Sequence, residues 1–250
     1  MADKPSRGLV LYAAGHAALL PTASGGGGGG NHLDAFASLA SCGFLSLRTP
    51  PPSGGGEGKC DSTILELAQL LDVYDDLFPA KNEETGGEIA QLDPQQLAVP
   101  KLSESKLGKL GMKTDLNRLD KLVGAIMEAA PISSAIASRI HVSVILSYGS
   151  TVENKNGFSI SNSSTETDSD LNLLRPRQSY TMKAGNILDN VRNHHPMLLA
   201  QWQEGVTRSD LTKGFTFEEF IKRGGNLAML AERFLHEVAF KLWKAPKYGA

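Results

Sequence analysis

Apolar residues recur along the chain with two different periods, and each period is typical of one kind of secondary structure. Short apolar runs predict strands at 8–13, 43–47, 140–146 and 196–202. Apolar residues at helical spacing predict helices at 33–40, 61–78, 115–130, 216–223 and 230–242. Because strands alternate with helices along the chain, we expect an α/β fold, with a layered sheet flanked by helices.

Polar residues mark where some of these helices begin. Thr63 with Glu66, and Thr216 with Glu219, have the spacing of a capping box, in which a hydroxyl and a carboxylate bond free backbone N–H groups. Gly224 follows the second of these helices and indicates its end. Pro131 indicates the end of the helix at 115–130, because proline cannot continue a helix.

Segments poor in apolar residues separate the predicted elements. They lie near 24–30, 50–59, 81–111 and 152–170, and the first of them contains an unbroken glycine run at 25–30. Glycine-rich and proline-rich segments do not hold regular structure, since glycine loses much backbone entropy and proline lacks an N–H donor. The chain of 250 residues is long enough to bury one good core, so we expect a single domain over 1–250 with these segments as loops.

Composition and charge narrow the classes of partner. A hydrophobic content of 41% with 21% charged residues is ordinary for a globular protein, and the formal net charge is −2. Such a balance gives no reason to expect nucleic acid or an anionic membrane as a partner. The longest apolar run, at 9–20, is too short to span a bilayer. We therefore expect a cytoplasmic protein whose partner, if it has one, is another protein.

A glycine-rich loop at 53–60, between a predicted strand and a predicted helix, favours one hypothesis of nucleotide binding. Backbone N–H groups and Lys59 would cradle phosphates there, as in a P-loop. However, Ser53 stands in place of the opening glycine, and Cys60 in place of the hydroxyl residue that holds magnesium. The alternative interpretation is a flexible loop.

Three carboxylates, Asp72, Asp75 and Asp76, share one face of the helix predicted at 61–78. Such a cluster could hold magnesium, but a second cluster on a facing helix is missing from the sequence. We interpret these residues as a solvated acidic face.

The histidines do not form a zinc pattern. His194 and His195 are adjacent on extended chain and point to opposite faces, so they do not chelate one ion together. His141 lies in an apolar strand, where we expect it to be a core residue with its hydrogen bonds satisfied.

Cys60 and Asp61 stand at the start of a predicted helix and are candidate catalytic residues. A helix N-terminus lowers the pKa of a thiol and favours bound anions. Helix capping explains Asp61 equally well, and the two readings stay open.

Several short fragments follow one another in an order similar to that of a known family. They read N-H-L-D-A-F-A at 31–37, C-D-S-T-I-L at 60–65, L-D-K-L-V-G at 119–124, V-I-L-S-Y-G-S-T at 144–151, and G-V at 205–206 ahead of F-T at 215–216. In this order they resemble the alkaline phosphatase superfamily and, within it, the cofactor-independent phosphoglycerate mutases. The resemblance implies an alkaline-phosphatase-like core in reduced form, since the chain is shorter than those enzymes.

The resemblance also implies which functional residues have changed. Enzymes of that family use two divalent metals to activate a serine or threonine and to neutralise the phosphoryl group. Cys60 aligns with the nucleophile, and Asp61 is the metal ligand that remains. The family's aspartate at the end of the first strand is replaced by A-A-G-H at 13–16, and its late Asp-His pair by Tyr148 and Gly149. The resemblance therefore implies that phosphoryl transfer has been lost.

Two hypotheses of function follow. In the first, the chain is a non-catalytic relative of metal-dependent phosphatases and phosphomutases, needs no cofactor, and has a binding or scaffolding role. The basic segment at 241–244 would then lie near a partner surface, although we expect Trp243 itself to pack in the core. In the alternative, the chain is an active metal-dependent phosphatase or mutase with a rebuilt site. Cys60 and Asp61 would be catalytic, Asp61 and His16 would bind manganese or zinc, and one of His141, His194 or His195 would join them.

Overall fold

The computed structural model describes residues 7–20, 31–49, 62–77, 109–149, 176, 182–183, 186–188, 190–192, 195–225 and 227–246. The predicted loops at 24–30, 50–59 and 152–170 lie outside these residues, as does most of the loop predicted at 81–111. Residues 109–111 of that last segment are helical, so the prediction of a loop was wrong there.

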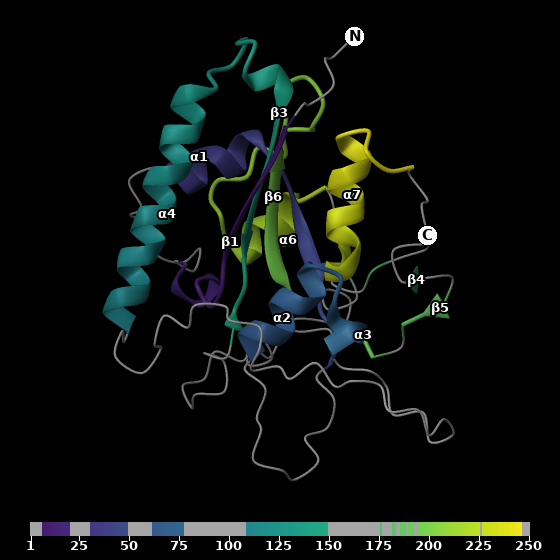
Figure 1. The fold of residues 1–250 in the computed structure, drawn as a ribbon. Helices are drawn as coiled ribbons and strands as arrows, with labels where there is room; N and C mark the ends of the chain where they lie inside the picture. Colours follow the sequence, from purple (N-terminus) through teal and green to yellow (C-terminus); the bar gives the residue numbers. More distant parts are fainter. Residues whose placement is uncertain are drawn as a thin grey trace, which may run out of the picture.

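A mixed sheet of five strands forms the centre of the fold (Figure 1). In spatial order the strands are β1 (Arg7–Ala13), β3 (Ile140–Leu146), β6 (Met197–Trp202), β2 (Ser41–Ser46) and β7 (Ala228–Leu230). β1 is parallel to β3 and β2 is parallel to β7, whereas β6 runs antiparallel to both of its neighbours, β3 and β2. All strands except β6 therefore point the same way.

We name the two ends of the central strands the carboxyl edge and the amino edge of the sheet. At the carboxyl edge, β1, β3, β2 and β7 end and β6 begins, whereas at the amino edge those four strands begin and β6 ends. A small two-stranded sheet of β4 (Met182–Lys183) and β5 (Asn186–Ile187) completes the described strands.

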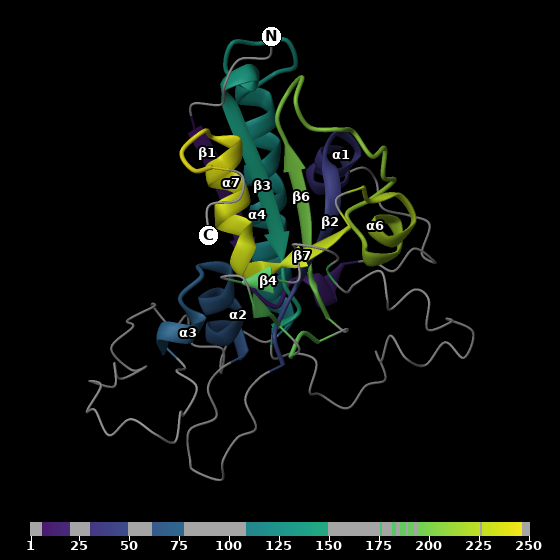
Figure 2. The same ribbon diagram turned by 90° about the vertical axis from the view of Figure 1, so that its right-hand side faces the viewer.

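Helices cover both faces of the sheet, which confirms the predicted α/β class with helices flanking a layered sheet (Figures 1 and 2). On one face, α1 (His32–Leu39), α4 (Lys109–Ala129) and α6 (Phe217–Arg223) pack over Phe44, Val144, Leu198 and their neighbours. On the other face, α2 (Ser62–Leu70) and α7 (Phe234–Lys241) pack over Leu45, Ile145 and Leu199. None of the described helices is long and apolar enough to cross a membrane.

The strands predicted at 8–13, 43–47, 140–146 and 196–202 correspond to β1, β2, β3 and β6, each within about two residues at its ends. The helix predicted at 216–223 is also confirmed, because Thr216 is its N-cap and its hydroxyl accepts a hydrogen bond from the Glu219 N–H.

The helix predicted at 61–78 is in fact broken. α2 ends at Leu70, Asp72 takes a left-handed conformation with φ of 57°, and α3 (Tyr74–Leu77) follows. The Asp72 N–H bonds the Gln69 carbonyl and the Val73 N–H bonds the Ala68 carbonyl, which is the Schellman arrangement that ends a helix.

Two further predictions of local structure were wrong. Glu66 is not part of a capping box, because its buried carboxylate pairs with Arg192 instead. The helix predicted from Leu230 begins only after β7 and a short 3-10 turn, η6 (Ala231–Arg233), because residues 228–230 pair with β2. A run of three buried apolar residues is too short to show a period, so this strand was not predicted from the sequence.

Candidate functional site

The first part of the candidate site is the junction of β1 and β3 at the carboxyl edge, where ligands commonly bind in α/β sheets. Ser147 ties the two strand ends together. Its hydroxyl accepts a hydrogen bond from the Gly15 N–H at 3.3 Å and lies 3.3 Å from the Tyr12 hydroxyl, and its carbonyl accepts from the Ala17 N–H at 3.0 Å. These strand ends are where the sequence resemblance predicted that metal ligands had been replaced.

Two glycines close this junction. Gly15 and Gly149 both have left-handed backbones, with φ of 75° and 59°. A Cβ on Gly149 would lie 3.0 Å from the Gly15 Cα and 3.2 Å from its nitrogen, so the position has no room for a larger side chain without a backbone shift. The chain therefore brings two backbones into contact at this junction and leaves no space there for a larger side chain.

Tyr148 occupies the interior beside these glycines. It is buried, its ring centroid lies 5.1 Å from that of His195, and burial raises the pKa of its hydroxyl to about 12. His195, with φ of 45°, is thus placed at the carboxyl edge. A neutral, buried phenol of this kind serves packing rather than acid–base chemistry near neutral pH.

His16, the predicted metal ligand, follows β1 at the same edge. Its Nδ1 lies 2.6 Å from the Ala14 carbonyl, which can only accept, so in the neutral ring Nδ1 carries the proton and Nε2 has a lone pair. Within the described part of the chain, that buried Nε2 has no hydrogen-bond partner. One imidazole nitrogen in this tautomer is a suitable metal ligand.

The other predicted site residues divide between the two edges and the undescribed part of the chain. Cys60, Asp61 and the glycine-rich loop at 53–60 lie outside the described residues, as does His194, so their roles remain predictions. Thr63, near the start of α2, has its hydroxyl 3.8 Å from the Cβ position of Gly149, so α2 begins close to the β1–β3 junction.

His141 does not join His16. It stands opposite Gly8 at the start of β1, whereas His16 follows the end of that strand. The length of β1 separates them by roughly 17 Å, at about 3.3 Å per residue. The hypothesis that His141 shares a site with His16 was therefore wrong. The prediction that His141 is a core residue is confirmed by its complete burial, but the prediction that its hydrogen bonds are satisfied was wrong for Nδ1, which has no partner of normal geometry within the described residues.

A cluster of charged residues, which we call the ion-pair network, occupies the same carboxyl edge beyond the end of β2. Its members are Arg48, Asp72, Asp75, Lys183 and Glu232. Arg48 is only 8% exposed and contacts Asp75 at 2.6 Å and Glu232 at 2.7 Å, and Glu232 is 2% exposed. Lys183 reaches Asp72, Asp75 and Glu232 at 2.7 to 2.9 Å.

Electrostatics in this network favour the charged forms. The hydrogen bond from Arg48 lowers the pKa of Asp75. Burial opposes the charge of Lys183, but hydrogen bonds to Asp72, Asp75 and Glu232 outweigh it and raise its pKa. Each buried charge therefore has an opposite charge beside it, which indicates a structural role.

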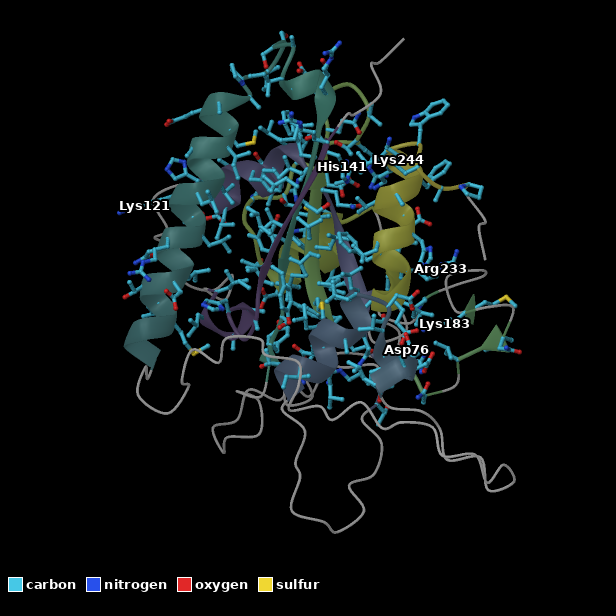
Figure 3. The ribbon with its side chains drawn as sticks, viewed as in Figure 1. Asp76, Lys121, His141, Lys183, Arg233 and Lys244 are labelled. Atoms are coloured by element: carbon cyan, nitrogen blue, oxygen red, sulfur yellow. The ribbon has the colours of Figure 1, made fainter. Side chains whose placement is uncertain are left out.

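The three aspartates predicted as a solvated acidic face differ in their ion-pair partners and in their exposure to solvent. Asp72 and Asp75 pair with Lys183, and Asp72 also contacts His236 at 3.0 Å. The interpretation was therefore wrong for Asp72, whereas Asp75 is exposed as predicted but is also engaged in ion pairs. Asp76 is exposed (Figure 3). Among the residues that the structure describes, no group of three or more His, Cys, Asp or Glu side chains could hold a metal ion.

A buried polar cluster lies at the opposite, amino edge and was missed by the sequence analysis. We call it the amino-edge cluster, and it consists of His141, Ser143, Gln201, Gln203 and Lys241. Figure 3 shows His141 at the end of the molecule away from Lys183 and Asp76. The sequence contained one signal for this cluster. Gln201, in β6, and Gln203, just after it, alternate with apolar residues, which places both amides on the same buried face of the sheet.

Comparisons with known proteins found no match to this chain. The chain matches no protein-family model, no curated protein and no solved structure. The side chains at the two edges of the sheet are therefore the basis for a proposal of function.

Proposed function

We propose that this chain is a non-catalytic relative of metal-dependent phosphatases and phosphomutases and acts by binding or scaffolding another protein. The observation that supports the proposal is the closed junction of β1 and β3. The backbones of Gly15 and Gly149 lie so close there that a Cβ on Gly149 would be 3.0 Å from the Gly15 Cα, and the side chain of Tyr148 is buried. A phosphoryl transferase of this class needs several ligands around its metals, and these positions supply none.

The ion-pair network supports the same proposal. Acidic residues near the carboxyl edge are engaged by Arg48 and Lys183, so they are not free to hold a cation. Glu66 is likewise paired, with Arg192 at 3.0 Å. Carboxylates that already have cationic partners are poor metal ligands, because binding a metal would leave a guanidinium or ammonium unpaired.

One observation favours the second candidate, a metal-dependent phosphatase or mutase with a rebuilt site. The buried Nε2 of His16 has a free lone pair and lies at the same edge as His195 and the start of α2. His16 would hold manganese or zinc together with Asp61, and the metal would polarise a phosphoryl group.

Metal retention separates the two candidates. The protein is incubated with manganese and with zinc, dialysed exhaustively, and its metal content is measured alongside hydrolysis of p-nitrophenyl phosphate. The binding role predicts less than about 0.1 equivalent of metal per chain and no hydrolysis above background, because two ligands hold a metal only weakly.

The variants His16→Ala and Asp61→Ala test the alternative, with Asp76→Ala as a control at an exposed carboxylate. One retained equivalent that is lost in His16→Ala and Asp61→Ala, but kept in Asp76→Ala, would replace the proposed role with the enzymatic one.

A further inference from the structure

β1 is an outermost strand of the central sheet, and β3 is its strand partner among the described residues (Figure 1). All residues of β2 and β6 are buried, whereas every residue of β1 is partly or fully exposed. We call the side of β1 that faces away from β3 its outer side. The described helices therefore leave β1 accessible to solvent along its whole length.

The pairing with β3 decides which backbone groups of β1 point to the outer side. The Ala13 carbonyl accepts a hydrogen bond from the Ser147 N–H at 3.1 Å, so Ala13 directs its backbone groups toward β3. Because this direction alternates along a strand, Gly8, Val10 and Tyr12 direct their N–H and C=O groups to the outer side. The outward groups of Gly8 and Val10 have no backbone partner among the described residues. Such a row of donors and acceptors is a template for a further strand.

The sequence of β1 lacks the features that keep other chains away from an outermost strand. Proteins protect such strands with lysine, proline, a bulge or a very short length. β1 has seven residues, R-G-L-V-L-Y-A, without lysine or proline, and its one charged residue is Arg7 at its start. It pairs with β3 residue by residue without a bulge. The outer side of β1 is therefore suited to pairing with a strand of another molecule.

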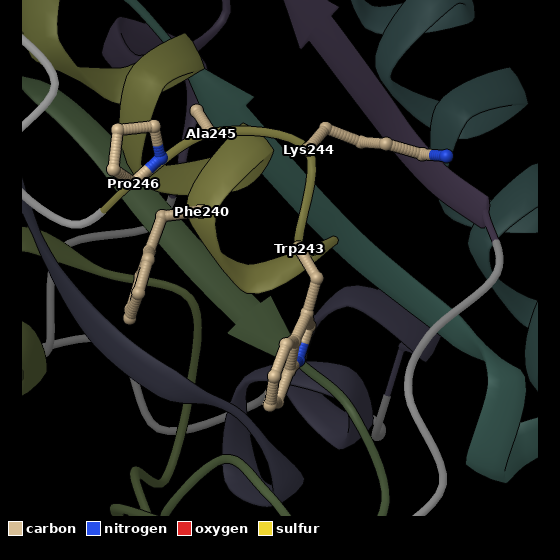
Figure 4. A pocket seen from close by; sticks show the side chains of 5 residues that line it. All are labelled: Phe240, Trp243, Lys244, Ala245 and Pro246. Carbon is tan, nitrogen blue, oxygen red and sulfur yellow. The ribbon is translucent and has the colours of Figure 1, made fainter.

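The end of α7 lies beside the start of β1. A Cβ on Gly8 would lie 3.0 Å from Leu242 Cδ1. Trp243 follows Leu242 and is 68% exposed, so the expectation that it packs in the core was wrong. A shallow depression here is lined by Phe240, Trp243, Lys244, Ala245 and Pro246 (Figure 4). Exposed apolar area of this kind favours contact with another protein surface.

The pattern of outward groups on β1 is complementary to itself. In an antiparallel pair centred on Val10, Val10 lies opposite the partner's Val10 and Gly8 opposite the partner's Tyr12. Every outward N–H then meets a C=O, and an aromatic ring lies beside a glycine, which lacks a side chain of its own. The two Arg7 residues would lie at opposite ends of the pair, about 20 Å apart, whereas parallel pairing would place these like charges side by side.

We propose that the outer side of β1 pairs antiparallel with β1 of a second copy of this chain, so that the two central sheets become continuous across a two-fold axis. Each chain has one such side, so the assembly closes as a dimer. The strand at the opposite side of the sheet, β7, has three residues and offers too short a template to extend it.

The first test is the oligomeric state of the full chain, measured by sedimentation velocity. We expect a reversible dimer with a Kd of about 10 µM over a concentration range of about 1 to 100 µM, because one strand pair buries less area than a standard interface. A monomer at the highest concentration, or growth beyond a dimer, would overturn the proposal.

Hydrogen exchange then locates the interface on the unaltered chain. Exchange of the Gly8 and Val10 amides should slow by at least about 3-fold from the lowest to the highest concentration, because pairing protects them. The Leu9 and Leu11 amides face β3 and should be protected at both concentrations. A dimer in which the Gly8 and Val10 amides gain no protection would use another surface and contradict the proposal.

Two variants at one position separate backbone pairing from side-chain contact. Val10→Pro removes an outward N–H and leaves the bonds to β3 in place, so it should weaken dimerisation by at least about 10-fold. Val10→Ala keeps the N–H and should change the Kd by less than about 3-fold. Equal effects of the two variants, or a dimer unaffected by Val10→Pro, would contradict strand pairing. If circular dichroism shows that Val10→Pro does not fold, the exchange experiment on the unaltered chain still decides.

The inference goes beyond the proposed function, and the two fail separately. Retained metal with phosphatase activity would overturn the binding role without concerning the outer side of β1. A monomeric chain would overturn only the proposed pairing of β1.

Discussion

The ion-pair network and the amino-edge cluster both bury polar groups against the same sheet, but among the described residues only the cations of the network contact carboxylates. Arg48 and Lys183 contact Asp72, Asp75 and Glu232 at ion-pair distance. Lys241, by contrast, is bonded to the neutral amide of Gln201. The network joins distant segments, since Arg48 and Glu232 are 184 residues apart in sequence.

The difference in charge pairing indicates which of the two regions contributes more to the stability of the fold. A buried charge with an opposite partner is most costly when that partner is removed, so the network should behave as a clamp. The half-buried Lys241 has no carboxylate partner within the described residues, so its charge is stabilised by water and by the Gln201 amide. The contrast predicts different responses to mutation and to pH at the two regions.

The largest expected effect is at the centre of the network. Arg48→Met should lower the free energy of unfolding by about 3–5 kcal/mol, because it leaves the buried Glu232 with Lys183 as its remaining cationic partner. Urea denaturation measures this change. Arg118→Met is the control, since Arg118 pairs with Asp115 on the exposed face of α4, and its effect should stay below about 0.5 kcal/mol. Similar small losses in both variants would mean that the network is screened by water and does not act as a clamp.

The second-largest effect is a pH dependence of stability that arises from His141 in the amino-edge cluster. The pKa of His141 is lowered from 6.5 to about 4 in the folded chain, so between these values the unfolded chain binds the proton and the folded chain does not. Stability should therefore fall as pH decreases from about 6.5 to 4, by up to about 3 kcal/mol. Denaturation at a series of pH values measures the slope. His141→Gln should flatten it, and the control His236→Gln, at an exposed histidine, should not; an unchanged slope in His141→Gln would show that His141 is not its source.

The network should respond to pH in a lower range. The pKa of Asp75 is lowered from 3.8, so its contribution is present above that value and disappears as pH falls through the lowered pKa. The carboxylate of Asp75 is 53% exposed, so at neutral pH Asp75→Asn should cost less than about 1 kcal/mol. The difference from the unaltered chain should shrink below pH 3.8. Asp76→Asn, an exposed neighbour, should show no difference at any pH, and a persistent Asp75 effect at pH 2 would point to packing as its cause.

The smallest effect concerns Trp243 beside the amino-edge cluster. Because its side chain is exposed, Trp243→Ala should change the free energy of unfolding by less than about 0.5 kcal/mol. Trp202 is buried in the core, so Trp202→Ala should cost about 3–5 kcal/mol in the same thermal or urea experiment. A comparable cost for the two tryptophans would mean that Trp243 packs in the core as Trp202 does.

The sequence predicted most local structure correctly because the signals are themselves local. Apolar runs located β1, β2, β3 and β6, and the Thr216 cap located α6. The same reasoning ended the first strand at residue 13, where β1 also ends, and His16 follows three residues later. It failed at β7, which is too short to show a period, and at Asp72, whose left-handed backbone interrupts a continuous apolar pattern.

The candidate site was predicted less well, because its contacts join residues that are far apart in the sequence. Glu66 has the spacing of a cap but pairs with Arg192, 126 residues away. Lys241 has the spacing of a solvated pair with Glu237, yet α7 turns its side chain toward Gln201 on β6. Periodicity indicates that such a residue lies on a helix, but it does not indicate which strand that helix covers.

By itself, the sequence determined most of the helices, four of the five strands of the central sheet and the α/β class of this protein, since backbone sterics and the burial of apolar faces act over a few neighbouring residues. Only the tertiary structure decided that β6 runs antiparallel between β3 and β2, that Gly15 meets Gly149, and that Arg48 meets opposite charges while Lys241 does not. The reason is physical. The energy of a buried charge depends on the groups within a few ångströms of it, and strand pairing brings those groups together from distant parts of the chain.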